Sequence, residues 1–261
     1  MPVFIDQTGR SISLHSTPQR IISLVPSQTE LLFDLGLTDQ VIGITKFCIH
    51  PKEWFRSKKR IGGTKQINID QIKQLQPDLI IANKEENVKD QIEELEKYFP
   101  VWISNIYNMN DACQMIKQIG LITGKDEISI EITKTIKEKF NQLSSNSSKI
   151  RTAYLIWHNP YMTVGADTFI HSMLEAAGFT NIFSSEKRYP EVTIEELQIQ
   201  NCELLLLSSE PFPFKQKHID ILQKQLPNTK ILLVNGEMFS WYGSRMLQAP
   251  AYFMNLRHQI K

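Results

Sequence analysis

Short apolar runs alternate with segments of helical periodicity along most of this chain, and this alternation limits the folds open to it. The apolar runs fall in two series, RIISLVP (20–26), VIGIT (41–45), LIIAN (79–83) and VWISN (101–105), then TAYLIW (152–157), ELLLLSS (203–209) and KILLVN (230–235). We expect helices near 27–36, 69–76, 87–98 and 110–123, and then near 168–178, 194–200, 216–226 and 249–259. Because strands that alternate with helices form βαβ units, the pattern predicts an α/β fold with two parallel sheets.

A helical segment at 126–149 separates the two series. Its apolar residues lie at helical spacing and would share one face: Ile128, Ile132, Ile136, Phe140 and Leu143. About 20 helical residues would span about 30 Å. We therefore expect two Rossmann-like lobes, 1–123 and 150–261, joined by one long helix within 124–149.

An internal repeat supports two related lobes. INIDQIKQLQPDLIIANKEEN (67–87) aligns without a gap with VTIEELQIQNCELLLLSSEPF (192–212). Asp78 then matches Glu203, and Glu85 matches Glu210. Because acid–acid matches in one register are less common than apolar ones, we interpret the repeat as a duplication.

Ligands of open parallel sheets bind beyond the carboxyl ends of the strands, so two such lobes predict one cleft between them. The loop NGEMFSWYGSR (235–245) follows such a strand and combines a carboxylate, three aromatic rings and an arginine. These rings are interpreted as a wall of a ligand pocket, although they could instead cap the edge of the sheet. The predicted ligand-binding residues are Phe47, Lys65, Glu85, Trp157, Tyr161, Arg188, Tyr189, Glu210, Glu237, Trp241, Tyr242 and Arg245.

Composition and motifs exclude several functions. The net charge of +1 disfavours nucleic acid or a membrane surface as partner. The sequence contains no 18-residue apolar run, no P-loop, no G-x-G-x-x-G and no G-x-S-x-G. We therefore expect a non-catalytic, monomeric binding protein. A catalytic pair of Glu85 and Glu210 is the enzymatic alternative.

Metal binding is a second alternative. Cys48 and His50 form a C-x-H pair on a loop after a predicted strand, and Glu85 or Glu210 could complete a zinc or copper site. A buried cysteine that packs as a small apolar side chain is the competing interpretation.

Two acids occupy matching positions of the repeat. Asp70 and Glu195 each lie two residues after a candidate N-cap, Asn68 and Thr193. Acids there stabilise the positive end of a helix dipole. They could equally present a matched pair of negative charges to a partner with the same two-fold symmetry.

With these features together, the chain resembles the helical-backbone substrate-binding proteins of ABC importers for cobalamin and iron–siderophore complexes. The resemblance is carried by RIISLVPSQTELLFDLG (20–36), IGGTKQINIDQIKQLQPDLIIA (61–82) and the segment 167–197, DTFIHSMLEAAGFTNIFSSEKRYPEVTIEEL. It implies that Asp70 and Glu195 dock onto a permease and that Phe47 packs against a corrin ring. The chain departs from the family pattern at Thr64 and Lys65, where an aromatic residue is often found, and at Asp70, which replaces a longer Glu.

The resemblance leads us to expect a bulky metal-chelate ligand, a corrinoid first and then haem or a ferric siderophore. No cofactor is required, and a divalent metal is a further candidate for the bound species. The alternative is a cytosolic metal- or corrinoid-handling protein that binds the ion through Cys48 and His50. Because the first residues, MPVFIDQTGRS, carry no export signal, we expect a cytoplasmic protein if Met1 is the natural start. If an export signal is missing from this sequence, a periplasmic or cell-surface protein is expected.

Overall fold

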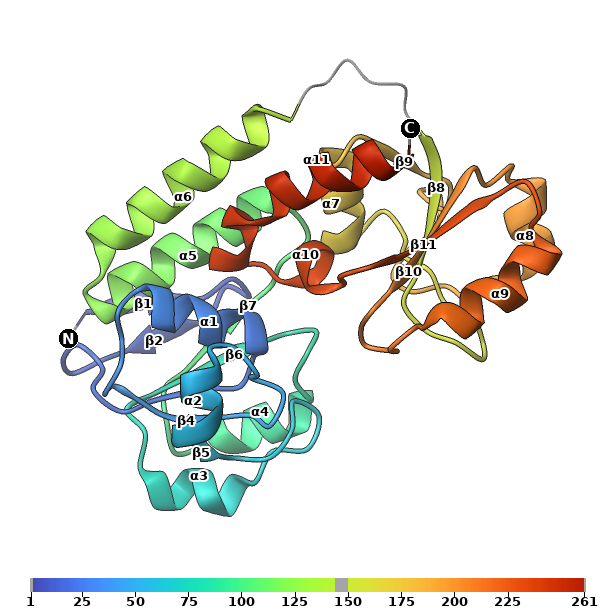
Figure 1. Cartoon of the computed structure of the whole chain (residues 1–261). Coiled ribbons are helices and arrows are strands. Elements are labelled where there is room, and N and C mark those ends of the chain that lie inside the picture. Colours follow the sequence, from blue (N-terminus) through green and yellow to red (C-terminus); the bar gives the residue numbers. More distant parts are fainter. Residues whose placement is uncertain (1, 144–149, 261) are drawn as a thin grey trace. The chain divides into compact units, whose positions relative to one another are not determined.

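A computed structural model describes residues 2–143 and 150–260 of the chain. These residues form two compact units, drawn in Figure 1. Unit 1 comprises the chain up to Ile106, Asn110–Thr135 and Tyr242–Arg245. Unit 2 comprises Tyr107–Met109, Ile136–Trp241 and the segment from Met246 onward. Four residues from near the C-terminus therefore complete the unit that the N-terminal half of the chain builds.

Unit 1 contains a five-stranded sheet of order β5-β4-β3-β6-β7, in which every pair of neighbours is parallel. Its strands are β3 (Ile21–Ser23), β4 (Val41–Ile44), β5 (Lys59–Arg60), β6 (Leu79–Asn83) and β7 (Val101–Ser104). The helices that follow these strands or lie between them are α1 (Pro26–Asp34), α2 (Lys52–Ser57), α3 (Ile69–Leu75), α4 (Lys89–Glu96) and α5 (Met109–Thr123). All five residues of β6 are buried, which is typical of a parallel strand covered on both faces.

Unit 2 contains a four-stranded parallel sheet of order β11-β10-β8-β9. Its strands are β8 (Ile150–Leu155), β9 (Phe179–Asn181), β10 (Leu204–Ser208) and β11 (Lys230–Val234). Its helices are α7 (Phe169–Ala176), α8 (Ile194–Ile199), α9 (Gln216–Gln225), α10 (Glu237–Ser240) and α11 (Ala249–Ile260), with a 3₁₀ turn η1 at Ser244–Leu247. The predicted α/β class with two parallel sheets is confirmed.

The internal repeat appears in both the topology and the hydrogen bonds. Strands β7-β6-β3-β4 of unit 1 follow the same order as β11-β10-β8-β9 of unit 2. The Asp78 carboxylate accepts hydrogen bonds from the backbone N–H groups of Gln19 and Arg20, at 2.7 and 2.9 Å. The matching Glu203 accepts one from the backbone N–H of Arg151, at 2.7 Å. Each acid thus ties the start of one strand to the start of its neighbour.

The predicted N-caps of the matched helices are present. The Asn68 side chain accepts a hydrogen bond from the backbone N–H of Gln71, three residues on. Thr193 and Glu196 form a complete capping box at the start of α8. Asp70 and Glu195 occupy the second position of α3 and α8, where both side chains are exposed.

The chain passes from unit 1 to unit 2 within α6 (Asp126–Asn141), which is 16 residues long. The helix is shorter than the predicted 20 residues, and the end of the predicted segment, 144–149, lies outside the described residues. Ile132, Ile136 and Phe140 are buried as the spacing predicts, but Ile128 is exposed. Periodicity therefore identified the helix and most of its buried face, but not where it ends.

Several short elements were not predicted. They are the antiparallel hairpin of β1 (Val3–Ile5) and β2 (Ser11–Ser13), the strands β5 and β9, and the helices α2 and α10. Each has six residues or fewer, too few to display a clear period. No helix within the described ranges is long and apolar enough to cross a membrane.

Candidate functional site

In unit 1, the loop after β4 presents an aromatic ring to solvent. Phe47 is 50% exposed. A Cβ atom placed on Gly63 would lie 3.1 Å from Phe47 Cε2 and 3.2 Å from Lys46 Cε. Because Gly63 has no side chain, the Lys46 and Phe47 side chains can pack across it, with the ammonium 5.1 Å from the ring centroid.

The loop after β6 is held by hydrogen bonds that involve Asn83 and Lys65. The Asn83 side-chain oxygen accepts hydrogen bonds from the backbone N–H groups of Glu85 and Glu86, at 2.8 and 3.0 Å. The Lys65 ammonium donates to the Glu85 carbonyl at 2.8 Å. Asn83 therefore fixes two adjacent carboxylate-bearing residues at the carboxyl end of the sheet.

Tyr242 belongs to unit 1 and is buried there. Its hydroxyl donates a hydrogen bond to Glu86 Oε1 at 3.1 Å. Burial, and then the nearby negative charge of Glu86, raise the pKa of Tyr242 well above its ordinary value. The phenol therefore stays protonated and continues to act as a donor. Glu86 was not among the predicted site residues, although it lies in the same strand-end loop as Glu85.

In unit 2, the loops after β8 and β10 bring together a cluster of rings. His158 stacks on Phe212 with ring centroids 5.3 Å apart, and Trp157 meets Phe212 edge-on at 5.8 Å. Tyr161 packs against His158 at 5.2 Å. Trp157 is 41% exposed although it packs against this cluster. The predicted rings Trp157 and Tyr161 thus belong to one cluster, linked through Phe212 and His158, which are not among the predicted site residues.

Glu210 is a hydrogen-bond acceptor for the loop that follows β11. Its Oε1 accepts from the Ser240 hydroxyl at 2.6 Å and from Trp241 Nε1 at 3.0 Å. A Cβ on Gly236 would lie only 2.6 Å from Glu210 Cγ and 2.4 Å from Ser208 Oγ. Only glycine permits this close approach, so the sequence places Gly236 where the two loops meet.

The rings of NGEMFSWYGSR are mostly buried. Phe239 is inaccessible and packs against Tyr154 and Phe253, with centroids 5.2 and 4.8 Å apart. Trp241 is 7% exposed. This burial favours the interpretation that the rings cap the sheet, because little ring surface is left for a ligand.

Arg245, predicted to orient a ligand, is also buried. It forms a bidentate ion pair with Glu30 of α1, and both residues belong to unit 1. Arg188 lies on the surface of unit 2 with its guanidinium 5.5 Å from the Tyr189 ring centroid. Glu237 begins α10 and is partly buried. The ligand-binding roles assigned to these residues stay predictions.

The structure gives the Cys48–His50 alternative little support. Cys48 is fully buried, and its sulfur lies 3.0 Å from Thr29 Oγ1 and 3.2 Å from Thr45 Oγ1. Burial raises the pKa of this thiol, which disfavours the thiolate that a metal requires. Within residues 2–143 and 150–260, no group of three or more His, Cys, Asp or Glu side chains could hold a metal ion.

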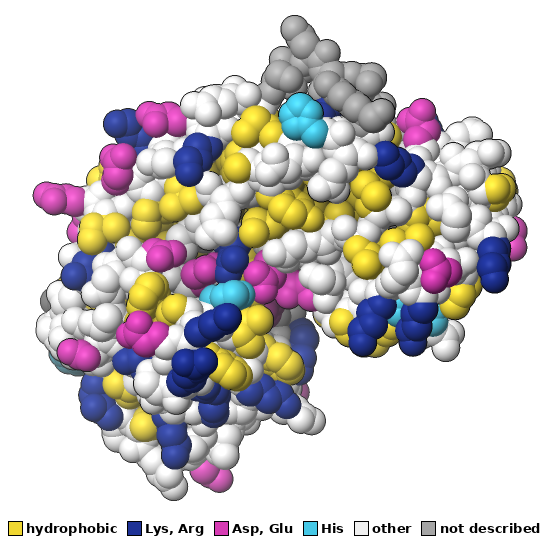
Figure 2. Space-filling view, in the orientation of Figure 1, with side chains coloured by type: hydrophobic (Ala, Val, Ile, Leu, Met, Phe, Trp, Pro, Cys, Tyr) yellow, Lys and Arg dark blue, Asp and Glu magenta, His cyan; other side chains and the backbone are white. Residues whose placement is uncertain are grey.

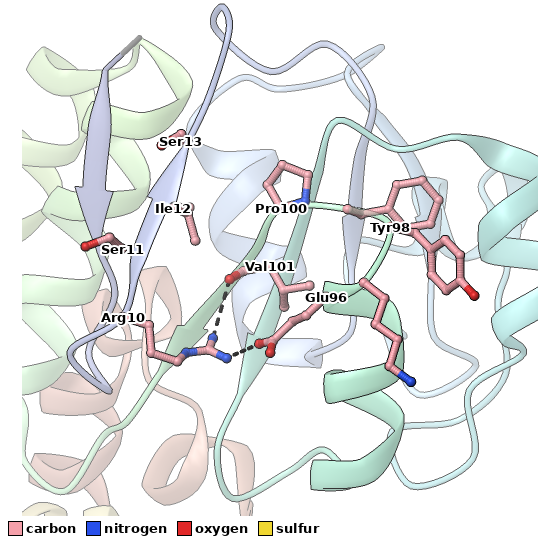
Figure 3. A pocket seen from close by; sticks show the side chains of 10 residues that line it. Arg10, Ser11, Ile12, Ser13, Glu96, Tyr98, Pro100 and Val101 are labelled. Carbon is pink, nitrogen blue, oxygen red and sulfur yellow. Dashed lines mark hydrogen bonds and ion pairs between the residues drawn. The ribbon is translucent and has the colours of Figure 1, made fainter.

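A hollow of about 440 Å³ lies at the other end of the unit 1 sheet, where β7 begins (Figure 3). Arg10, Glu96 and Val101 line it, and the Arg10 guanidinium donates to the Glu96 carboxylate and the Val101 carbonyl. Arg10 also donates to Asp6 at 2.7 Å. Because its charged groups neutralise each other at the amino end of the strands, this hollow is a poor candidate for the ligand site.

Known proteins were found that are similar to this chain in sequence and in fold, and they agree with the two α/β units described above. The profile of the family described as "Periplasmic binding protein" matches residues 21–227. The vitamin B12-binding protein of Vibrio vulnificus (strain CMCP6) is 27% identical over 204 residues, which cover 76% of this chain and 74% of that protein.

Solved structures share the fold. The periplasmic vitamin B12 binding protein BtuF of Vibrio cholerae superposes with a TM-score of 0.79 at 21% identity, covering 94% of this chain and 98% of that one. The periplasmic heme-binding protein RhuT from Roseiflexus sp. RS-1 gives a TM-score of 0.80 at 17% identity, covering 93% and 99%.

These matches define a substrate-binding protein of the ABC-transport class, and not an enzyme. The chain belongs to the periplasmic binding protein family.

Proposed function

We propose that the chain binds a bulky metal chelate, a corrinoid first and then haem or a ferric siderophore, and delivers it to an ABC permease. The B12-binding relative supports the corrinoid as first candidate, and the haem-binding structure with the same fold keeps haem in consideration. One observation carries the proposal. Each unit presents an exposed aromatic ring from a loop at the carboxyl end of its sheet, Phe47 in unit 1 and Trp157 in unit 2.

Such rings suit a bulky chelate for a physical reason. Each exposed ring leaves apolar surface in water, and covering that surface contributes about 25 cal/mol per Å². Rings also lose little conformational entropy on binding, because they have only two side-chain torsions. Phe47 is further held by packing over Gly63, and Trp157 by contact with Phe212. Both rings are therefore ordered before a ligand arrives.

Polar groups near these rings would orient the ligand. In unit 1, the Lys65 ammonium donates a hydrogen bond to the Glu85 carbonyl. In unit 2, Tyr161 packs against His158, which belongs to the same aromatic cluster as Trp157. The family comparison supports transport rather than catalysis for these groups, so the carboxylates Glu85 and Glu210 are proposed as polar contacts and not as an acid–base pair.

The first experiment is native mass spectrometry against cobalamin, cobinamide, haemin, a ferric siderophore and divalent metal salts. A one-to-one adduct with one chelate names the ligand class. Binding of that chelate is then titrated with Phe47→Ala and Trp157→Ala. We expect each variant to bind roughly 10-fold more weakly, which corresponds to about 1.4 kcal/mol.

Tyr98→Ala is the matched control, because Tyr98 is also a largely exposed ring, at 54%, but lies before β7 at the other end of the sheet. The Tyr98→Ala variant should bind the chelate with the same affinity as the unchanged protein. Equal affinities for all four proteins would refute the ring contacts, whereas an adduct with a metal salt alone would favour the Cys48–His50 alternative.

A further inference from the structure

A strongly basic segment lies in unit 1 between Lys46 and Arg60. It contains six cationic side chains and one acidic one, Glu53. The rest of the chain has 23 Lys and Arg against 27 Asp and Glu, so the near-neutral total hides a local excess of positive charge. We call this surface the basic face; its cations are Lys46, Lys52, Arg56, Lys58, Lys59 and Arg60.

The fold places the basic face at one edge of the five-stranded sheet. Its residues come from the loop after β4, from α2 and the residue that follows it, and from β5, which is the edge strand. Figure 2 shows the Lys and Arg side chains gathered over this part of unit 1. Lys52, Arg56 and Lys59 are exposed, and none of the six cations forms an ion pair within the described ranges.

Two cations of the face are held by contacts that leave their charge intact. Lys58 donates to the Thr38 carbonyl at 2.5 Å and lies 5.2 Å from the Trp54 ring centroid. Arg60 donates to the Lys58 carbonyl at 2.7 Å and lies 4.4 Å from the Phe55 ring centroid. Carbonyls and rings orient these groups without neutralising them, so the positive charge stays available to an external partner.

Apolar side chains lie among the cations. Phe55 and Ile49 are exposed by 38% and 42%. Trp54, their neighbour in sequence, is buried and meets Phe33 edge-on at 5.3 Å, which anchors α2 to the unit. The anchored helix thus directs Phe55 and Arg56 to solvent. Exposed apolar groups surrounded by lysines and arginines match the boundary between lipid headgroups and acyl chains.

We propose that the basic face docks unit 1 onto an anionic lipid bilayer. A small soluble anion would need donors that converge on one point, whereas these cations are spread over a helix, a strand and the loop before them. A bilayer offers negative charge over a whole surface, and each Lys or Arg near it contributes about a 5-fold gain in partition at low salt. This inference goes beyond the proposed function and does not depend on which chelate is bound.

The test is sedimentation of the full chain with vesicles of phosphatidylcholine alone or with 30 mol% phosphatidylglycerol. We expect binding to the anionic vesicles only, weakening as salt is raised. The variant Lys52→Gln, Arg56→Gln, Lys59→Gln should partition roughly 100-fold less. Phe55→Ser should lower partition several-fold and leave the salt dependence in place.

The matched control removes three exposed lysines elsewhere, Lys134→Gln, Lys137→Gln, Lys187→Gln, and so carries the same net charge. It should partition like the unchanged protein. The proposal is overturned if the unchanged protein ignores anionic vesicles, if it binds neutral ones equally, or if the two triple variants behave alike. Two competitors separate a lipid surface from other anionic sites. Vesicle binding that is retained in inorganic phosphate, at the concentration of the lipid phosphate, supports the proposal. Vesicle binding that is lost to a short oligonucleotide at low concentration indicates a nucleic-acid site and overturns it.

Discussion

The guanidinium of Arg245 donates two hydrogen bonds to the carboxylate of Glu30, from Nε at 2.9 Å and from Nη2 at 2.6 Å. The two residues are 215 positions apart in sequence, yet both belong to unit 1. Both side chains are largely buried. The pair therefore fastens the segment Tyr242–Arg245 to α1, and the integrity of unit 1 depends on residues near the C-terminus.

Removing the arginine should be costly. In Arg245→Met, Glu30 keeps its buried position but loses its counter-charge, which typically costs 3–5 kcal/mol. We expect the free energy of unfolding, measured by urea titration, to fall by about that amount. The double variant Glu30→Gln, Arg245→Met should recover part of the loss. Equal stability of Arg245→Met and the unchanged protein would mean that the pair does not hold the segment.

The pH dependence of stability should reveal the same carboxylate. Burial raises the pKa of Glu30 above its ordinary value, and the Arg245 charge partly offsets this. A raised pKa means that the unfolded chain releases this proton first as pH rises, so the Glu30 contribution to stability falls as the pH rises above about 4.5. Without Arg245 the pKa rises further, so the penalty of Arg245→Met should grow over this range. Urea unfolding of both proteins at several pH values measures this penalty. A penalty that becomes smaller toward neutral pH would contradict the prediction.

The duplicated acids Asp78 and Glu203 should have parallel roles of unequal size. Asp78 accepts two backbone hydrogen bonds and Glu203 one. We expect Asp78→Ala to lower the free energy of unfolding by about 1–2 kcal/mol and Glu203→Ala by about half as much. Glu138→Ala, which removes an exposed acid of α6, is the control and should change stability little. A larger effect for Glu203 than for Asp78 would argue against this reading of the repeat.

The buried thiols should be unreactive in the folded protein. All three cysteines are buried and none forms a disulfide, and burial raises the pKa of Cys48 and that of Cys202, the latter to about 11. Iodoacetamide at pH 8 should add no mass to the folded chain and three alkyl groups after denaturation. Cys48→Ser should leave chelate affinity unchanged. Rapid alkylation of native Cys48 would return the metal-binding alternative to consideration.

The sequence was informative wherever structure follows from neighbouring residues. The run 79–83 matches β6 residue for residue, because a continuous apolar run bounded by Pro77 and Asp78 and by polar Lys84 has one simple interpretation. The N-caps Asn68 and Thr193 were visible for the same reason. Local patterns also place Phe47 and Trp157 at strand ends, where both are exposed.

Long-range pairing was not readable from the sequence. Whether Trp241 is buried depends on Glu210, 31 residues earlier, which accepts its indole N–H. The role of Arg245 depends on Glu30 in the first helix. No periodicity connects such positions, so the sequence did not show that these residues also make contacts within the fold.

The matched acids at the start of α3 and α8 allow a test of permease docking, which remains a proposal. Asp70 and Glu195 are exposed, and neither supplies its helix with the capping contacts, which come from Asn68 and from Thr193 with Glu196. Asp70→Lys, Glu195→Lys should therefore fold and bind its chelate normally, with a stability loss of about 1–2 kcal/mol from the two helix dipoles. The same variant should fail to stimulate ATP hydrolysis by the cognate permease in nanodiscs. Glu127→Lys, Glu138→Lys reverses two exposed charges of α6, one of them also in a first turn, and should retain full stimulation. If both variants stimulate equally, the acids act only at their helix ends.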